Sequence, residues 1–305
     1  MNDYLLYTDS LTKTYKNQNA VKCIDFHVRK GAIYGLIGHN GAGKTTLLKM
    51  ICGLSVPTSG HIHLFGKSGK ELSKIRERVG CHIEAPGLYL DMSAYQNLKC
   101  KSIQRNIKGD TGIKELLELV GLEDTGNKKV KQFSMGMKQR LGIAMALVGE
   151  PDLLVLDEPI NGLDPQGIRE IREILIKLNQ DRGTTIIISS HILNEVARVA
   201  TDYGIIHKGE LVKEIAVDKL MEQCKEKILI RAANIRKVAD VLDKLRIKTY
   251  LIIDDESIKI DGYISESAYI NSELVKAGCE VSELMVQADS LEDYYFRLTG
   301  GAHNA

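Results

Sequence analysis

Residues 38–46, Gly-His-Asn-Gly-Ala-Gly-Lys-Thr-Thr, have the composition and spacing of a loop that wraps phosphate groups. Four residues separate Gly38 from Gly43, and Lys44 and Thr45 come next. Glycine permits the backbone conformations and the close approach through which N–H groups at a helix N-terminus meet an anion. We expect Lys44 to reach the β- and γ-phosphates of a nucleotide and the Thr45 hydroxyl to coordinate Mg²⁺. The predicted nucleotide contacts of this loop are Gly38, Asn40, Gly41, Gly43, Lys44, Thr45 and Thr46.

A pair of carboxylates follows an apolar run farther along the chain. Leu153 to Leu156 reads as a buried strand, and Asp157 and Glu158 end it. We expect Asp157 to bind Mg²⁺ and Glu158 to polarise the attacking water. A solvated acidic pair at a strand end is the alternative, but the phosphate loop upstream favours nucleotide hydrolysis.

The elements that must position these residues alternate between apolar β-rich runs and helical patterns up to about residue 215. The strand 32–37 should lead into the phosphate loop, and a helix from Thr45 to Cys52, ended by Gly53, should follow it. This alternation predicts an α/β domain with a mixed, largely parallel sheet over residues 1–215.

The pattern of apolar and charged residues changes after residue 215, and residues 216–305 predict a small accessory α+β domain. A charged, helix-like linker is expected over 217–227. The order β-α-β-β-α-β that follows matches a ferredoxin-like unit. Its expected elements are strands 227–231, 249–253, 257–260 and 280–284, helices 235–245 and 268–277, and a last helix over 290–298.

Composition excludes several classes of protein. In 305 residues, 41 Lys and Arg balance 40 Asp and Glu, so no basic field favours nucleic acid as a partner. The N-terminus lacks the pattern of a signal peptide, and no apolar run is long enough for a membrane span. The six cysteines form no C-x-x-C pair, and we interpret them as reduced, mostly buried thiols.

Three further segments occur in a characteristic order. Residues 133–140, Phe-Ser-Met-Gly-Met-Lys-Gln-Arg, precede the acidic pair and open a helix. Residues 161–165, Asn-Gly-Leu-Asp-Pro, follow the pair, and His191 comes after the apolar strand 185–190. With the phosphate loop, this order resembles the ATP-binding cassette (ABC) proteins over nearly all of residues 4–215. The resemblance implies a P-loop NTPase cassette with a helical subdomain, and hydrolysis of ATP with Mg²⁺.

The resemblance also implies that the site is shared between subunits. Ser134 and Gly136 would form a second anion site at a helix N-terminus, which in these cassettes closes over the γ-phosphate held by another subunit. Asp164 would lie at the dimer seam, and His191 would hydrogen-bond the γ-phosphate. Tyr15 would stack on the adenine ring, with a surface tyrosine on an early strand as the alternative.

One position departs from the family pattern. Cassettes usually place a glutamine where this chain has Glu84, and a carboxylate there still binds a hard cation but cannot donate an N–H. Glutamate followed by a proline-glycine turn resembles the subunits of bacitracin-type and lantibiotic-immunity exporters; neutral drift is the alternative. The apolar stretch 85–98 would border a groove for a permease helix, or belong to the subdomain core.

The resulting hypothesis is the ATP-hydrolysing motor subunit of a bacterial ABC exporter of a peptide antibiotic or similar toxic compound. It would work at the cytoplasmic face of the membrane with integral-membrane permease subunits and a second ATP-binding subunit, identical or different. A soluble cassette ATPase acting on ribosomes or DNA is the alternative from another class, and a binding-protein-dependent importer is a third. The pattern leaves open the transported substrate and whether the C-terminal domain braces the dimer or regulates it.

Overall fold

The computed structural model divides the chain into two compact units, residues 1–217 and residues 218–305. The predicted division after residue 215 lies close to this one. The residues that the structure describes are 4–84, 87–107, 109–110, 112–223, 226–288, 294–295 and 298–299.

A central sheet organises the N-terminal unit, and its strands run in the order β11-β10-β4-β9-β8-β7. Neighbours from β10 to β7 pair in parallel, whereas β11 pairs antiparallel with β10. The prediction of a mixed, largely parallel sheet is therefore confirmed. The strands are β4 (Ile33–Ile37), β7 (Val79–His82), β8 (Leu153–Asp157), β9 (Thr185–Ser190), β10 (Asp202–His207) and β11 (Glu210–Ala216).

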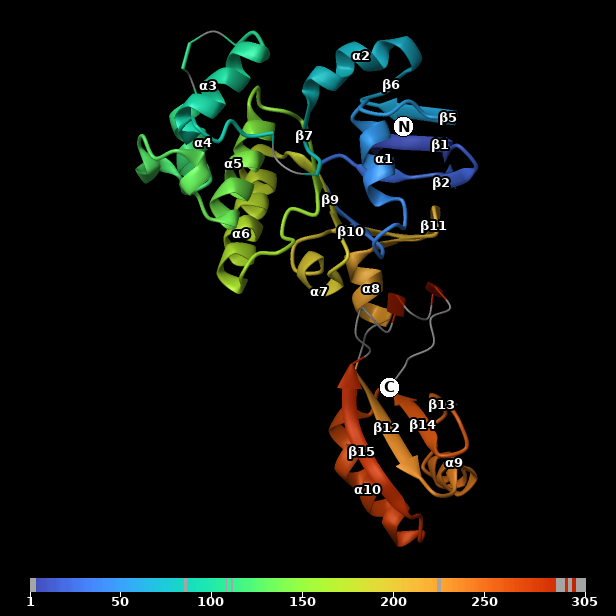
Figure 1. The fold of residues 1–305 in the computed structure, drawn as a ribbon. Helices are drawn as coiled ribbons and strands as arrows, with labels where there is room; N and C mark the ends of the chain where they lie inside the picture. Colours follow the sequence, from blue (N-terminus) through green and yellow to red (C-terminus); the bar gives the residue numbers. More distant parts are fainter. Residues whose placement is uncertain are drawn as a thin grey trace. The chain divides into compact units, whose positions relative to one another are not determined.

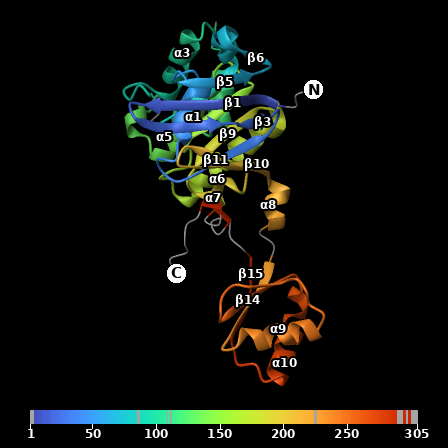
Figure 2. The same cartoon turned by 90° about the vertical axis from the view of Figure 1, so that its right-hand side faces the viewer.

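An antiparallel sheet lies on one side of this unit, with strand order β2-β1-β5-β6 and with β3 also paired to β1. Figure 2 shows β1 and β5 running across that side. The strands are β1 (Tyr4–Tyr15), β2 (Gln18–Ile24), β3 (His27–Arg29), β5 (Ser59–Leu64) and β6 (Lys67–Ser68).

Helices cover both faces of the central sheet. In Figure 1, α3, α4, α5 and α6 lie on its left, and α1 lies on its right with the antiparallel strands. The helices are α1 (Lys44–Ile51), α2 (Leu72–Ile75), α3 (Ala94–Gln104), α4 (Ile113–Leu119), α5 (Met135–Leu147), α6 (Pro165–Arg182), α7 (Leu193–Val196) and, at the boundary of the units, α8 (Val217–Gln223). The predicted helix after the phosphate loop is α1, and Gly53 beyond it has a φ of +78°, as a helix-terminating glycine should.

The strands of the central sheet are apolar on both faces because each face packs against a separate core. Along β8, Leu154 and Leu156 join the core formed with α3–α6, whereas Leu153 and Val155 join the core formed with α1 and the antiparallel strands. Continuous apolar runs are the expected pattern for parallel strands buried on both sides. The polar residues at the ends of these strands are then held at one edge of a rigid sheet.

The C-terminal unit has the element order β-α-β-β-α-β, and its sheet order is β13-β14-β12-β15 with antiparallel neighbours throughout. Ile228, Ile230 and Ile260 are buried against the two helices. The elements are β12 (Glu226–Ala232), α9 (Ile235–Lys244), β13 (Tyr250–Ile252), β14 (Ser257–Asp261), α10 (Ser267–Lys276) and β15 (Val281–Ala288). The helix predicted over 290–298 falls largely outside the described residues.

Candidate active site

The phosphate loop connects β4 to α1, and its glycines are required by their surroundings. A Cβ on Gly38 would lie 2.4 Å from the Ile206 carbonyl oxygen, and one on Gly43 would lie 2.5 Å from that of Ala20. Gly43 also has a φ of +110°, which L-residues avoid. Gly43 is the N-cap of α1, and within the described residues no side chain caps that helix. Its first N–H groups are thus available to an anion.

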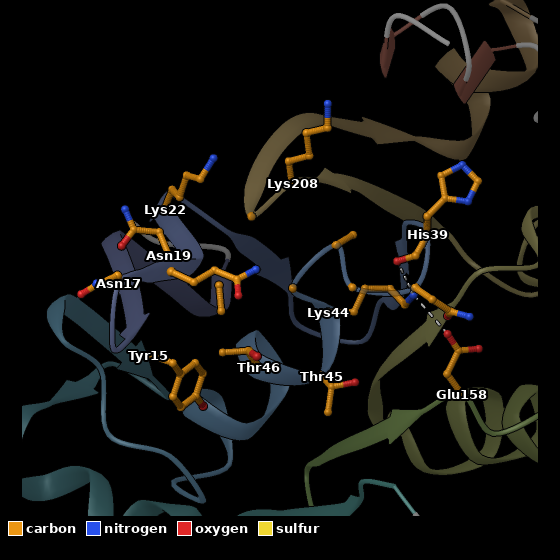
Figure 3. Close-up of a pocket in the computed structure, with 17 residues that line it drawn as sticks. Tyr15, Asn17, Asn19, Lys22, His39, Lys44, Thr45, Thr46, Glu158 and Lys208 are labelled. Atoms are coloured by element: carbon orange, nitrogen blue, oxygen red, sulfur yellow. Dashed lines mark hydrogen bonds and ion pairs between the residues drawn. The ribbon is translucent and has the colours of Figure 1, made fainter. Parts of the chain in front are cut away.

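Lys44 is a buried cation held at the centre of the loop. Its side chain is 5% exposed, and its ammonium donates to the carbonyl oxygens of Gly38 (2.6 Å) and His39 (3.3 Å). The Glu158 Oε1 atom lies 3.1 Å from the Lys44 Nζ atom. Figure 3 shows the ammonium between the His39 carbonyl and the Glu158 carboxylate. An anion entering this loop therefore meets a fixed positive charge.

Glu158 lies between Lys44 and His191. Its Oε2 atom is 2.8 Å from the His191 Nδ1 atom, and its Oε1 atom accepts no hydrogen bond within the described part of the chain, so the contact with Lys44 is an ion pair. The Glu158 backbone has a φ of +49°, an uncommon conformation for glutamate. Its N–H donates to the Ser189 Oγ atom (3.0 Å) and carbonyl oxygen (3.2 Å), which hold it there. One carboxylate oxygen thus keeps free capacity to accept a proton.

Asp157 is a buried carboxylate with both oxygens in use. Its Oδ2 atom accepts a hydrogen bond from Thr45 Oγ1 (2.7 Å), and its Oδ1 atom accepts one from Ser189 Oγ (2.5 Å). The tertiary structure therefore brings the phosphate loop, the end of β8 and the end of β9 to one point. A hydroxyl and a carboxylate side by side are the oxygen donors that Mg²⁺ prefers.

A pocket of about 670 Å³ opens over the phosphate loop. Tyr15 lies at it with an exposed ring, and Lys13 Nζ is 5.0 Å from the centroid of that ring. The predicted site residues that line the pocket are Tyr15, Asn40, Gly41, Gly43, Lys44, Thr45, Thr46 and Glu158. The lining residues not predicted from the sequence include Asn17, Gln18, Asn19, Lys22, His39 and Lys208.

The segments around Ser134 and Asp164 lie together, away from that pocket lining. Ser134 caps α5 by accepting from the Met137 N–H (3.2 Å), and Asp164 caps α6 by accepting from the Gly167 N–H (3.1 Å). Met135 packs over the loop before α6, since a Cβ on Gly162 would lie 2.8 Å from its Cε atom. Gly136 adjoins the same loop, because a Cβ added to it would lie 3.9 Å from a Leu163 methyl group. The structure thus joins these predicted residues to one another and not to the phosphate loop of the same chain.

Glu84 pairs with the phosphate-loop helix. Its φ is +62°, its carboxylate is 62% exposed, and its Oε1 atom lies 2.5 Å from the Nζ atom of Lys49 on α1. The Glu84 carboxylate is paired with Lys49 and, among the described residues, does not take part in the hydrogen bond between Thr45 and Asp157. In the stretch 85–98, of which residues 85 and 86 lie outside the description, Tyr89 is exposed and Leu98 is buried in the core. That stretch is therefore partly core and partly surface.

Besides these lining residues, sequence reasoning missed two buried polar residues near the acidic pair. Ser189 contacts both carboxylate residues, and His82 on β7 is buried near Asp157. Burial lowers the pKa of the His82 imidazole, while a hydrogen bond with Gln139 and the charge of Asp157 oppose this. Its Nε2 atom has no hydrogen-bond partner within the described residues. The signal that could have revealed both residues is a polar side chain inside an apolar strand.

The prediction of mostly buried thiols is wrong. Cys23 and Cys81 are exposed, and Cys52 and Cys100 are partly exposed. Among the described cysteines, burial is confined to Cys279, and Cys224 lies outside the description. The physical reason is position, because the exposed thiols lie on β2 and β7, which are edge strands of their sheets.

Among the helices that the structure describes, none is both long enough and apolar enough to cross a bilayer.

Comparison with known proteins places these features in a family. The family model described as ABC transporter matches residues 21–161. The chain is 40% identical to the bacitracin transport ATP-binding protein BcrA of Enterococcus faecalis over 300 residues, which cover 98% of this chain and 97% of that protein. It is 44% identical to the lantibiotic transport ATP-binding protein SrtF of Streptococcus pyogenes over 216 residues, which cover 70% of this chain and 92% of that protein.

Solved structures show the same relationship. The dimeric post-hydrolysis state of the ATP-binding cassette MJ0796, bound to ADP and Pi, matches with a TM-score of 0.64 at 28% identity, covering 70% of this chain and 98% of that chain. The cassette fold that the resemblance to ABC proteins implied is thereby confirmed. The chain belongs to the ABC transporter ATP-binding proteins and is an ATP-hydrolysing cassette.

Proposed function

We propose that this chain drives the export of a peptide antibiotic of the bacitracin or lantibiotic kind through separate membrane subunits, at the cytoplasmic face of the membrane. The support comes from relatives named for bacitracin transport that match 97–98% of the chain, including the C-terminal unit. The same matches disfavour a soluble cassette acting on ribosomes or DNA. Glu84, as the glutamate of an exporter subgroup, adds to this support.

In this proposal Lys44 changes partners during the cycle. Its ammonium is paired with Glu158 in the structure, and the triphosphate of ATP competes for it as a stronger anion. Once Lys44 binds phosphate, Glu158 is released to accept a proton from the attacking water as a general base. His191, which contacts the other oxygen of Glu158, orients that carboxylate and hydrogen-bonds the γ-phosphate.

The oxygen donors beside the phosphate loop fit Mg²⁺. Thr45 and Asp157 would hold the ion, which neutralises phosphate charge in reactions of this class. The Thr45 hydroxyl donates to Asp157 in the structure, so its lone pairs face away from that carboxylate. Glu84 would not be a direct ligand of the ion, because its carboxylate is paired with Lys49.

The site is completed by a second ATP-binding subunit. Ser134, Gly136 and Asp164 lie outside the pocket lining in one chain. Ser134 and Asp164 are helix N-caps and Gly136 lies in the first turn of α5, so these residues are at helix N-termini suited to anions. A second cassette, identical or different, would bring these residues over the γ-phosphate. Tyr15 would stack on the adenine ring at the other end of the pocket.

The position of Glu158 between Lys44 and His191 carries the hydrolytic part of the proposal. Glu158→Gln keeps the shape and removes the base, so we expect ATP binding to persist and turnover to fall by about 100-fold or more. Glu118→Gln on the exposed face of α4 is the matched control and should retain turnover. Retained turnover in Glu158→Gln would remove Glu158 from the role of base.

The export part of the proposal needs a separate test. Cells that express the chain with its membrane subunits should tolerate bacitracin or a lantibiotic better than cells that carry the Glu158→Gln variant. Equal tolerance, with normal ATP turnover in the purified subunit, would refute the substrate class and leave the hydrolytic assignment standing.

A further inference from the structure

Strand β15 forms one edge of the sheet in the C-terminal unit. It pairs antiparallel with β12 on one side, and no other described strand pairs with it. Figure 1 shows it at the border of that sheet, next to β12. About half of its backbone N–H and C=O groups point away from β12, because the direction of hydrogen bonding alternates along a strand. The outer side of β15 therefore presents a row of groups with which a further strand can pair.

The opposite edge of the same sheet is protected against such pairing. Its strand, β13, has only three residues, and the acidic residues 254–256 follow it closely. Short edge strands and nearby charges are common ways in which proteins prevent unwanted strand pairing. In contrast, β15 spans eight residues, contains neither lysine nor proline, and carries a single charge, on Glu283. One edge of this sheet is thus protected, and the other is not.

The unprotected edge is apolar where it is exposed. Met285 and Val286 are 39% and 41% exposed, whereas Leu229 and Ile228, which lie opposite them on β12, are buried. Successive side chains of a strand point to opposite faces of its sheet. The exposed part of β15 therefore offers apolar surface on both faces.

The residue types along β15 are arranged almost symmetrically about Met285. Leu284 and Val286 flank it, and Glu283 and Gln287 lie one position farther out. When a two-fold axis relates two antiparallel strands, one residue lies opposite its own copy, and residues equally far on either side lie opposite each other. With Met285 at the axis, Leu284 meets Val286 of the second copy, and Glu283 meets Gln287 of the second copy. Apolar side chains then oppose apolar ones, and a carboxylate opposes an amide that can donate to it.

This register also suits the core and the charge of the unit. Leu284 packs against the core beneath the helices, and Val286 lies on the same face because it is two positions away. An axis perpendicular to the sheet keeps the helices of both copies on that face. The Glu283 Oε2 atom lies 3.4 Å from the Arg231 Nε atom of the same chain, so its charge is already paired. An axis at Leu284 would instead place Glu283 against Met285 of the second copy, which cannot donate a hydrogen bond to it.

We propose that β15 is a homodimer contact, through which the C-terminal units of two copies of this chain join their sheets edge to edge. Its consequence for ATP turnover rests on the proposal that a second ATP-binding subunit completes the site, and it makes that subunit a second copy. The contact involves no nucleotide, so it holds two cassettes together while their active sites are open. Such a link raises the effective concentration of one cassette for the other.

Met285→Cys tests the contact and its register in the full, nucleotide-free chain. Opposed residues of antiparallel strands have Cα atoms about 4.5–5.5 Å apart, a separation that a disulfide can span. Mild oxidation should give a covalent dimer in which peptide mapping finds position 285 linked to position 285. Ser282→Cys on the same strand is the matched control, because its thiol would lie about 20 Å from its copy. Leu251→Cys on the exposed part of β13 is the control for the other edge, and neither control should link to its own copy.

Met285→Lys tests the contact without a cross-link. It places two like charges opposite each other at the axis, so the nucleotide-free chain should change from dimer to monomer in sedimentation velocity at micromolar concentration. Met285→Leu should stay dimeric, which separates the effect of charge from the loss of methionine. In Met285→Lys, the protein concentration that gives half-maximal specific turnover should rise about 10-fold or more, with turnover at saturating concentration unchanged.

The outcomes separate this proposal from the others. Monomeric nucleotide-free protein, or linkage of position 282 at the same rate as position 285, would overturn it. Slowed deuterium exchange of the β15 amides only in the presence of membrane subunits would assign the edge to a membrane partner and overturn it as well. A β15 dimer with an unchanged concentration dependence of turnover would refute its part in catalysis. Dimerisation of Glu158→Gln on addition of ATP tests the shared nucleotide site separately, so failure of either proposal can be recognised.

Discussion

The Ser189 hydroxyl bridges the two carboxylate residues of the site, and its removal should weaken both. It donates to Asp157 Oδ1 at 2.5 Å and accepts from the Glu158 N–H at 3.0 Å, and the side chain is fully buried. A buried hydrogen bond to a charged group is worth about 1.5–3 kcal/mol, and a neutral one about 1 kcal/mol. The Glu158 N–H keeps the Ser189 carbonyl oxygen at 3.2 Å, so the second loss is partial. Ser189→Ala should therefore lower the free energy of unfolding by about 3 kcal/mol.

The same substitution should reduce catalysis without touching the nucleotide. Ser189 acts through Asp157 and Glu158, and loss of a residue that orients such groups costs about 10–100-fold. We expect turnover to fall by that factor, with a smaller change in KM for ATP. The left-handed backbone of Glu158 should also relax, because one of the groups that hold it is gone.

Urea unfolding followed by circular dichroism and steady-state ATP hydrolysis measure the two effects. Ser102→Ala is the matched control, because Ser102 is also buried and donates to a carbonyl oxygen, that of Leu98 at 3.0 Å, away from the site. It should lose about 1 kcal/mol and keep its turnover. Equal stability losses in the two variants, with turnover of Ser189→Ala within about twofold of the unchanged chain, would refute the bridging role.

Three other perturbations test separate parts of the site. Tyr15→Ala should raise KM for ATP by about 10-fold, since base stacking is worth about 1–3 kcal/mol, while Tyr15→Phe should not; ATP titrations that show no difference would exclude stacking. Glu84→Gln should change the permease-stimulated ATPase activity more than the ATPase activity of the isolated subunit, and equal effects on both would favour a purely chemical role. It should lower the free energy of unfolding by less than about 1 kcal/mol, because the ion pair of Glu84 with Lys49 is largely exposed. Alkylation of Cys81 by iodoacetamide should be half-maximal near pH 7, because the pKa of its thiol is lowered to about 7, so the thiolate predominates above that pH and the thiol below it. In Cys52→Ser the midpoint should rise. An unmoved midpoint would exclude Cys52 as the main cause of the lowered pKa.

Local features of the fold and site followed from the sequence. The helix after the phosphate loop, the strands at 153–157 and 185–190, and the element order of the C-terminal unit depend on periodicity and on residues close in the chain. Ser134 was expected to begin a helix, and the structure shows it as the N-cap of α5. Caps and loops of this kind are fixed by neighbours within a few residues, so spacing alone identifies them.

Contacts between segments that are far apart in the chain could not be predicted from the sequence. Thr45 meets Asp157 across 112 positions, and Ser189 meets Asp157 across 32. Nothing local to Ser189 indicates that β9 lies beside β8, or that its hydroxyl reaches a carboxylate. Those contacts exist because the sheet order brings the strand ends to one edge.

The sequence by itself determined which chemical groups the chain carries: a phosphate loop, an acidic pair and helix N-termini that can bind anions. Each of these is recognised from residues only a few positions apart. The tertiary structure decided how these groups are connected. It paired Lys44 with Glu158 and Glu84 with Lys49. The physical reason is that such pairs depend on strand order and on the packing of α1 against the sheet, which are set by burial across the whole domain and not by any stretch of residues read alone.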